Sequence, residues 1–185
     1  MQVKFTEVQN ASERNKVKEL YNKSVPAHER AYFYPLWWKR KRPNVSFVNI
    51  YDGDKWVGFV FFSLCEDLVY IWFFATYDTA HSKEYDSAML SEIKRLYPEH
   101  RIVLSIEAEN ENADNAEQSR KEKQFYEDNG FRETGYFVKR KTDSFEIMLA
   151  GKAFHIEELY RVNKEVYPLI GRFIVSDLRK QIRKK

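Results

Sequence analysis

An apolar run decides the fold of this chain, because residues 68–75 read Leu-Val-Tyr-Ile-Trp-Phe-Phe-Ala. The run is rich in β-branched and aromatic residues and is too short for a typical helix, which predicts a central strand buried on both faces. A polar turn from Thr76 to Ser82 follows, and then one apolar stripe of an amphipathic helix, formed by Tyr85, Met89, Ile93 and Leu96. The free N–H groups at the start of such a helix make a natural anion site, so we expect a phosphate-bearing cofactor there.

The flanking segments predict further strands of the same sheet. Val45–Tyr51 and Trp56–Leu64 are hydrophobic runs separated by Asp-Gly-Asp-Lys, which is a strong hairpin pattern. The acidic turn Glu66-Asp67 then joins the hairpin to residues 68–75, so three successive strands form an antiparallel meander. Arg101–Glu107 is a further buried strand, and the helix before it predicts a parallel, right-handed crossover.

Two helical segments precede the meander. Gln2–Glu7 predicts a first strand, and Asn10 and Ser12 can cap a helix that carries Val17, Leu20 and Tyr21. Pro26 ends this helix, and a second, aromatic helix is expected from Ala27 to Trp38. Its rings could line an acceptor pocket or simply pack on the sheet.

The composition bounds the class of protein. The chain has 185 residues, 43% hydrophobic and 32% charged, which fits one soluble globular domain. No apolar run reaches the ~18 residues of a membrane span, and the N-terminus lacks a signal-peptide core. A lone Cys65 cannot form an internal disulfide, so we expect a cytoplasmic protein. The net charge of +3 does not by itself demand an acidic partner, and we expect the basic cluster 39–42 to be a solvated helix end.

The second half of the chain predicts the remaining elements. Ala116–Asn129 reads as a helix with Gly130 as its C-cap, and Phe131–Val138 and Phe145–Leu149 read as strands. A helical extension begins near Gly151, with apolar residues at helical spacing, namely Ile156, Leu159, Tyr160, Val166, Ile170, Phe173, Ile174, Leu178 and Ile182. The extension could pack back on the domain, form a homodimer contact or, least expected, bind a membrane surface or nucleic acid. We therefore divide the chain into a domain at residues 1–150 and an extension at 151–185.

Three short segments carry a family resemblance: Phe125-Tyr126-Glu127-Asp128-Asn129-Gly130-Phe131, Asn115-Ala116-Glu117-Gln118 and Tyr51-Asp52-Gly53-Asp54. Together with the order of elements, they make residues 1–150 resemble the GNAT family of acyl-CoA-dependent N-acetyltransferases. The resemblance implies an α+β, three-layer fold with a mixed, mostly antiparallel twisted sheet of about seven strands and helices on both faces.

The resemblance also implies the residues of the site. Backbone groups of Phe73, Phe74 and Ala75 would pair with the pantetheine arm of acetyl-CoA, and Tyr126 would protonate the departing thiolate. We expect Glu107, at the end of its strand, to be the base for the amine, with Glu66 and Asp67 as weaker alternatives. The cofactor would further contact His81, Ser82, Lys83, Glu84, Tyr85, Asp86, Ser87 and Asn115.

The phosphate loop departs from the family pattern. That pattern is Arg or Gln, two residues, Gly, one residue, then Gly or Ala, but this chain reads His81-Ser82-Lys83-Glu84-Tyr85-Asp86. Acidic residues at both glycine positions add Cβ bulk and negative charge beside an anionic ligand. Two hypotheses follow: an acetyltransferase that acts on an amine of a small molecule or peptide, or a catalytically silent GNAT-like binding module. We expect no metal, because the four histidines show no metal-ligand spacing, and no nucleic-acid or membrane partner.

Overall fold

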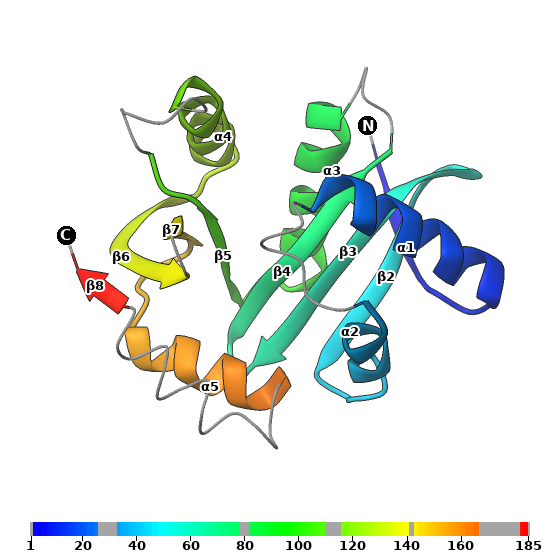
Figure 1. The fold of residues 1–185 in the computed structure, drawn as a ribbon, viewed down its shortest axis with the longest axis horizontal. Helices are drawn as coiled ribbons and strands as arrows, with labels where there is room; N and C mark the ends of the chain where they lie inside the picture. The colour runs from blue at the N-terminus through cyan, green and yellow to red at the C-terminus, as the bar shows by residue number, and fades with distance from the viewer. Residues whose placement is uncertain are drawn as a thin grey trace. The chain divides into compact units, whose positions relative to one another are not determined.

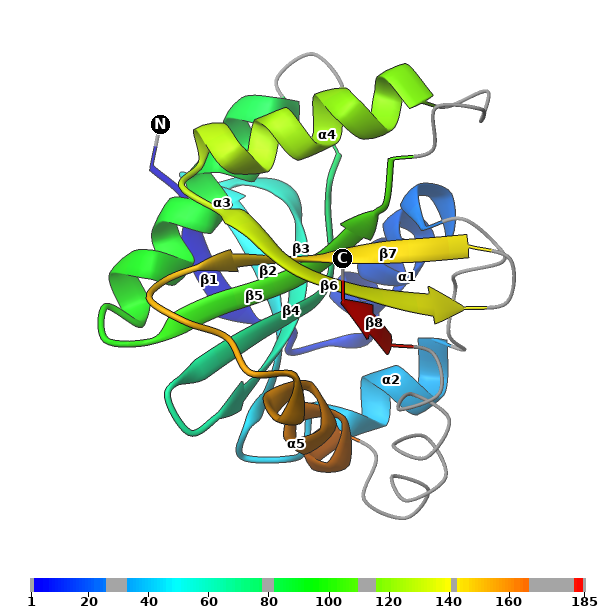
Figure 2. The same ribbon diagram turned by 90° about the vertical axis from the view of Figure 1, so that its left-hand side faces the viewer.

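The computed structural model describes residues 2–25, 33–77, 82–109, 116–140, 143–166 and 182–184. The chain forms two compact units, of which the first comprises residues 1–64 and 71–98 and the second residues 65–70 and 99–185. The strand β4 (Leu68–Thr76) contains the apolar run of residues 68–75. Its first three residues belong to the second unit and the rest to the first. Figures 1 and 2 show the two units as ribbons.

The predicted elements are present with small changes in their bounds. Before β4 the structure has β1 (Lys4–Glu7), α1 (Ala11–Ser24), α2 (Phe33–Lys39), β2 (Val45–Asp52) and β3 (Lys55–Cys65). After β4 it has α3 (Ser82–Leu96), β5 (Arg101–Glu107), α4 (Ala116–Asp128), β6 (Arg132–Arg140), β7 (Asp143–Ala150), α5 (Ile156–Val166) and β8 (Ile182–Lys184).

The first unit is built on the predicted meander. β1 pairs with β2 and β2 with β3, both antiparallel, and β4 is the next hydrogen-bonded neighbour of β3. The hairpin between β2 and β3 turns through Gly53 and Asp54, because Asp52 still pairs with Lys55. Asn10 is the N-cap of α1, since its side chain accepts a hydrogen bond from the backbone N–H of Glu13, whereas Ser12 lies inside the helix.

Aromatic rings fill one face of this sheet. Tyr21 of α1 packs on Phe59 and Phe73, and Phe33 and Trp37 of α2 pack on Phe47. These α2 rings are buried, so they pack on the sheet. The part of the predicted aromatic helix before Phe33 lies outside the described residues.

The α3 helix covers the other face of the first unit. Tyr85, Met89 and Ile93 are buried as their spacing predicts. The prediction for Leu96 is wrong, because its side chain is 41% exposed at the last turn of the helix. Leu90 completes the buried face instead.

The second unit contains the predicted parallel pair. Leu68–Tyr70 of β4 pairs in parallel with Arg101–Val103 of β5, whereas β4 continues to Thr76 and β5 to Glu107. β5 pairs with β7, and β7 with β6, in antiparallel fashion. In both views α4 and α5 lie on opposite sides of these three strands (Figures 1 and 2).

The extension packs back within the second unit. Leu159, Val162 and Val166 of α5 are buried, and Phe154 contacts the ring of Tyr136 on β6. The helical prediction for Ile182 is wrong, because this residue belongs to β8, which pairs with β6. The other apolar positions predicted after Val166 lie outside the described residues.

Candidate cofactor and catalytic residues

The α3 helix begins where the sequence predicts an anion site. Ser82 is the first residue of the helix, and Lys83 and Glu84 are exposed in its first turn. The first backbone N–H groups of a helix have no acceptor in the preceding turn, so they can receive an anion. His81 lies outside the described residues.

Asp86 turns its carboxylate toward the end of β4. Its Oδ1 accepts a hydrogen bond from the Thr76 hydroxyl at 3.0 Å. Burial raises the pKa of Asp86 to about 6, although the Thr76 hydrogen bond opposes the shift. One of the two acidic side chains in the phosphate loop is therefore anchored on β4.

Tyr85 is a packing residue at the same helix end. Its ring is buried, and its hydroxyl donates to Asp52 at the end of β2 at 3.2 Å. The Lys55 ammonium lies 5.6 Å from the centre of the same ring. These contacts tie the start of α3 to the β2–β3 hairpin.

The end of β4 is closely packed against β3. Ala75 is buried, and the half-buried ring of Phe73 contacts Phe61 as well as Tyr21. A Cβ placed on Gly58 of β3 would lie 2.2 Å from the Ala75 carbonyl oxygen, so only glycine permits this approach. The backbone of residues 73–75 lies beyond the three residues of β4 that pair with β5.

A helix cap fixes the position of Tyr126 on α4. The Phe131 N–H donates to the Tyr126 carbonyl at 3.0 Å and the Gly130 N–H to Glu127 at 2.8 Å, which is the Schellman pattern. Gly130 has a φ of 77°, and the rings of Tyr126 and Phe131 meet at 5.7 Å, as the hydrophobic contact of that motif requires. The Tyr-x-x-x-Gly-Phe segment is thus a helix stop that sets the buried Tyr126.

A charged cluster lies one turn before Tyr126. Lys123 is ion-paired with Glu133 of β6 and, at 3.0 Å, with Glu146 of β7. Burial lowers the pKa of Lys123, but the two carboxylates outweigh it and raise the pKa to about 12. Glu146 is buried, and its Oε1 has no hydrogen-bond partner among the described residues. The cluster was not predicted from the sequence, because no local pattern indicates that a lysine on a helix pairs with glutamates on two later strands.

Glu107 ends β5 and is half-buried. It pairs in register with Phe145 of β7, and the ladder extends one step further through the Ala108 N–H and the Ser144 carbonyl at 2.8 Å. The role of Glu107 as a base stays a prediction. Asn115 lies outside the described residues.

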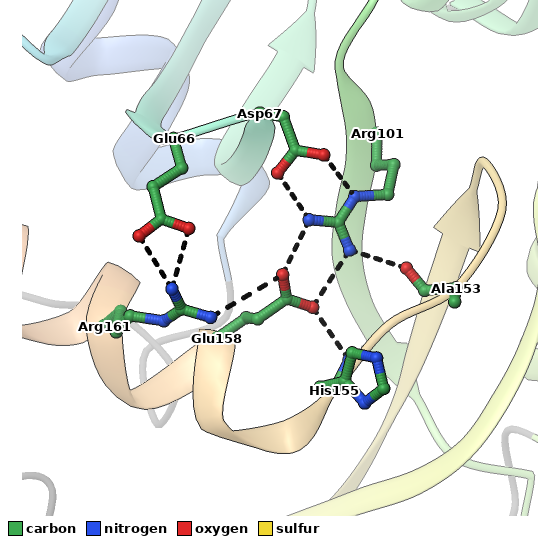
Figure 3. Close-up of polar contacts among 7 residues, drawn as sticks. All are labelled: Glu66, Asp67, Arg101, Ala153, His155, Glu158 and Arg161. Carbon is green, nitrogen blue, oxygen red and sulfur yellow. Dashed lines mark hydrogen bonds and ion pairs between the residues drawn. The ribbon is translucent and has the colours of Figure 1, made fainter.

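The two alternative bases are engaged by arginines (Figure 3). Both carboxylate oxygens of Asp67 accept from Arg101, at 2.6 and 3.0 Å, and both oxygens of Glu66 accept from Arg161 at 2.7 Å. The Arg101 hydrogen bonds lower the pKa of Asp67 despite an opposing effect of burial. A carboxylate with a lowered pKa is a poor proton acceptor, which disfavours Asp67 as the base.

Glu158 of α5 completes this polar cluster. Its oxygens accept from Arg101 at 2.6 and 3.0 Å, and Oε2 also accepts from the backbone N–H of His155 at 2.8 Å (Figure 3). Burial would raise the pKa of Glu158, but Arg101 and the His155 N–H lower it overall. The cluster attaches the start of α5 to the start of β5.

The described residues contain neither a membrane-spanning helix nor a metal-binding cluster. None of the helices in those ranges is long and apolar enough to cross a membrane. Nor do three or more His, Cys, Asp or Glu side chains in the same ranges gather so that they could hold a metal ion.

The sequence of residues 14–131 matches the model of the acetyltransferase (GNAT) family. This match spans more than half of the chain, so the protein belongs to that family. No curated protein sequence matches the chain.

Solved structures of the same family share the fold. A GNAT-family protein from Bacteroides thetaiotaomicron, assigned as an acetyltransferase, has a TM-score of 0.70 at 18% identity, covering 92% of this chain and 98% of that one. The ribosomal-protein-S18-alanine N-acetyltransferase from Escherichia coli has a TM-score of 0.55 at 11% identity, with coverages of 83% and 96%. An aminoglycoside 6'-N-acetyltransferase complexed with coenzyme A has a TM-score of 0.59 at 13% identity, with coverages of 80% and 96%. The predicted GNAT-like fold is confirmed.

Proposed function

We propose that the protein is an N-acetyltransferase that moves an acetyl group from acetyl-CoA to an amine. The observation that carries the proposal is the family match, because residues 14–131 include β4, the start of α3, and the helix stop that sets Tyr126. A structurally similar enzyme has been solved with coenzyme A, which supports the same cofactor class here.

The groups of the first unit fit an acyl-CoA. Pyrophosphate would be held by the first N–H groups of α3 with Ser82 and Lys83, while Ser87 lies in the following turn. The pantetheine arm would pair with the backbone of residues 73–75. Asp86 is anchored on Thr76, so Glu84 is the acidic side chain that remains exposed in the first turn.

The chemistry needs one proton donor and one proton acceptor. The amine nitrogen attacks the thioester carbonyl, the carbon–sulfur bond breaks, and the sulfur leaves as a thiolate. The Tyr126 hydroxyl would give its proton to this thiolate, and Glu107 would take the proton released by the amine, directly or through water. Solvent then returns the two groups to their starting states.

The acceptor is proposed only as a class. Similar structures are named for acetyl transfer to an aminoglycoside and to the alanine of a ribosomal protein, so both small molecules and peptides are candidate acceptors. A homodimer through residues 151–185 remains a further prediction, which size-exclusion chromatography with light scattering would test.

A thiol-release assay tests the proposal. The protein is incubated with acetyl-CoA and a panel of polyamines, aminoglycosides and N-terminal peptides, and free coenzyme A is measured. Tyr126→Phe should lower turnover about 100-fold, as loss of a general acid does, and should leave acetyl-CoA affinity unchanged. Tyr160→Phe, a half-buried tyrosine of α5, is the matched control. Equal turnover of the Tyr126→Phe variant and the wild type would remove the assigned role.

The silent binding module is the second candidate, because Glu84 stands where the family has glycine. It predicts that Glu84 weakens cofactor binding so far that no amine in the panel is acetylated. The absence of both heat and a thermal shift at millimolar acetyl-CoA would favour this candidate.

A further inference from the structure

The Asp86 carboxylate stands out among the charged groups of the first unit. It is half-buried, and its described hydrogen-bond partner is a neutral hydroxyl, that of Thr76 at 3.0 Å. Buried carboxylates usually pair with a cation or with several N–H donors. A residue placed in this way calls for a reason beyond packing.

The charged groups on the neighbouring elements are engaged elsewhere. Asp52, at the end of β2, accepts the Tyr85 hydroxyl at 3.2 Å, and the Lys55 ammonium lies over the Tyr85 ring. On α3 itself, the side chains of Lys83 and Glu84 are exposed. Burial and the Thr76 hydrogen bond, rather than a neighbouring charge, therefore set the protonation of Asp86.

Helix geometry places this carboxylate close to the proposed anion site. Asp86 follows Ser82 by four residues, so the two lie on one face of α3, about one turn or 5.4 Å apart along the axis. An anion on the first N–H groups of α3 would sit within roughly 10 Å of the carboxylate. At that separation two negative charges repel appreciably in a partly buried setting.

We propose that Asp86 sets the affinity for the phosphate end of coenzyme A by taking up a proton from solvent when the cofactor binds. The inference rests on the proposed function. In the bound state the neutral carboxylic acid removes the repulsion, and its oxygen still accepts the Thr76 hydrogen bond. This arrangement lets an aspartate stand where the family has a small, uncharged residue.

The size of the effect follows from proton linkage. The carboxyl group titrates near pH 6 in the free protein. If the bound anion raises its pKa by about one unit, affinity for coenzyme A falls about tenfold between pH 5 and pH 8. Asp86→Asn is neutral at every pH, so it should bind about tenfold more tightly than wild type at pH 8 and equally at pH 5.

Isothermal titration with coenzyme A measures this effect without catalysis. Titrations at pH 5, 6, 7 and 8, in buffers of different ionisation enthalpy, give both the affinity and the number of protons taken up. The 3'-phosphate of coenzyme A also titrates near pH 6, so the informative quantity is the difference between wild type and variant with the same ligand. Asp86→Asn should abolish most of the proton uptake near pH 7.

Variants of Thr76 separate this role from a merely structural one. Thr76→Ser keeps the hydroxyl and should keep the wild-type pH profile. Thr76→Val removes a hydrogen bond to the charged form, so the midpoint of the profile should move to higher pH. Glu19→Gln, an exposed carboxylate of α1, is the matched charge control and should follow the wild type.

The outcomes are distinct. A wild type that gives no heat with millimolar coenzyme A overturns the proposed function and this inference together. A wild type that binds, with Asp86→Asn showing the same affinities and the same proton uptake, overturns the inference alone.

Discussion

Replacing Arg101 by methionine removes the guanidinium at the centre of the cluster in Figure 3. Its partners differ in burial, because the Glu158 side chain is 8% exposed and that of Asp67 is 58% exposed. After the replacement Asp67 returns to water, but the buried Glu158 keeps only the His155 N–H and a longer ion pair with Arg161, at 4.0 Å. The loss of stability should therefore come mainly from Glu158.

The magnitude follows from this burial. Removing one partner of a buried ion pair costs about 3–5 kcal/mol of stability. Because Arg101 is partly exposed, we expect a loss at the lower end of this range, about 3 kcal/mol. For a chain of this size that corresponds to a fall in Tm of roughly 6–12 °C.

Circular dichroism during thermal unfolding measures the loss, and its pH dependence checks the cause. The pKa values of Asp67 and Glu158 are both lowered, so their contribution is present above their ordinary pKa and is lost as pH falls through the lowered values. The difference between wild type and Arg101→Met should accordingly shrink below about pH 4.

Arg161→Met is the matched control, because this arginine binds the exposed Glu66 at 2.7 Å and approaches Glu158 only at 4.0 Å. A surface pair contributes about 1 kcal/mol or less, so its loss should lower Tm by no more than about 4 °C. An equal effect of the two substitutions, or a Tm for Arg101→Met within about 2 °C of wild type at pH 7, would refute the reasoning.

Three further predictions concern single residues of the proposed site. Gly130→Ala forces an alanine to a φ of 77°, so it should cost about 1 kcal/mol in urea unfolding and lower turnover through Tyr126, whereas Gly130→Asn should lose less. Gly58→Ala brings a methyl group against the backbone of Ala75, and we expect a loss of about 1–3 kcal/mol together with weaker acetyl-CoA binding by titration. The folded-state pKa of Asp86, about 6, lies above its unfolded value, so wild-type stability should fall as pH rises from about 4 through 6. Asp86→Asn should therefore raise the free energy of unfolding more at pH 8 than at pH 4, by up to about 3 kcal/mol. An equal effect of Asp86→Asn at the two pH values, or wild-type behaviour of either glycine variant, would count against the corresponding prediction.

Much of the fold could be predicted because local patterns agree with it. Arg101–Glu107 is observed with its predicted bounds, since an apolar run between a helix and a polar loop leaves little choice. Gly130 was predicted as a cap from its place after a helical pattern, and the left-handed backbone there confirms it.

The misses occur where periodicity has no information about tertiary packing. Leu96 continues the apolar spacing of α3, but the helix ends there and the ring of Tyr97 takes the contact with Phe62 instead. Ile182 fits a helical pattern in the sequence, yet it lies in a strand that pairs with β6.

The sequence names candidate residues for the site, but it does not give their orientation. The sequence places acids at positions 84 and 86, whereas only the structure shows that Asp86 faces Thr76. Arg101 and Glu158 are separated by 57 residues in the chain, so no local pattern could pair them.

Calorimetric titration with acetyl-CoA at pH 6.5 tests the central claim most directly. If this chain is an acetyl-CoA-dependent N-acetyltransferase, the titration should give saturable heat with one cofactor bound per chain. The affinity for acetyl-CoA should fall when Lys83 is replaced by glutamate. The absence of both heat and a thermal shift at millimolar acetyl-CoA would contradict it.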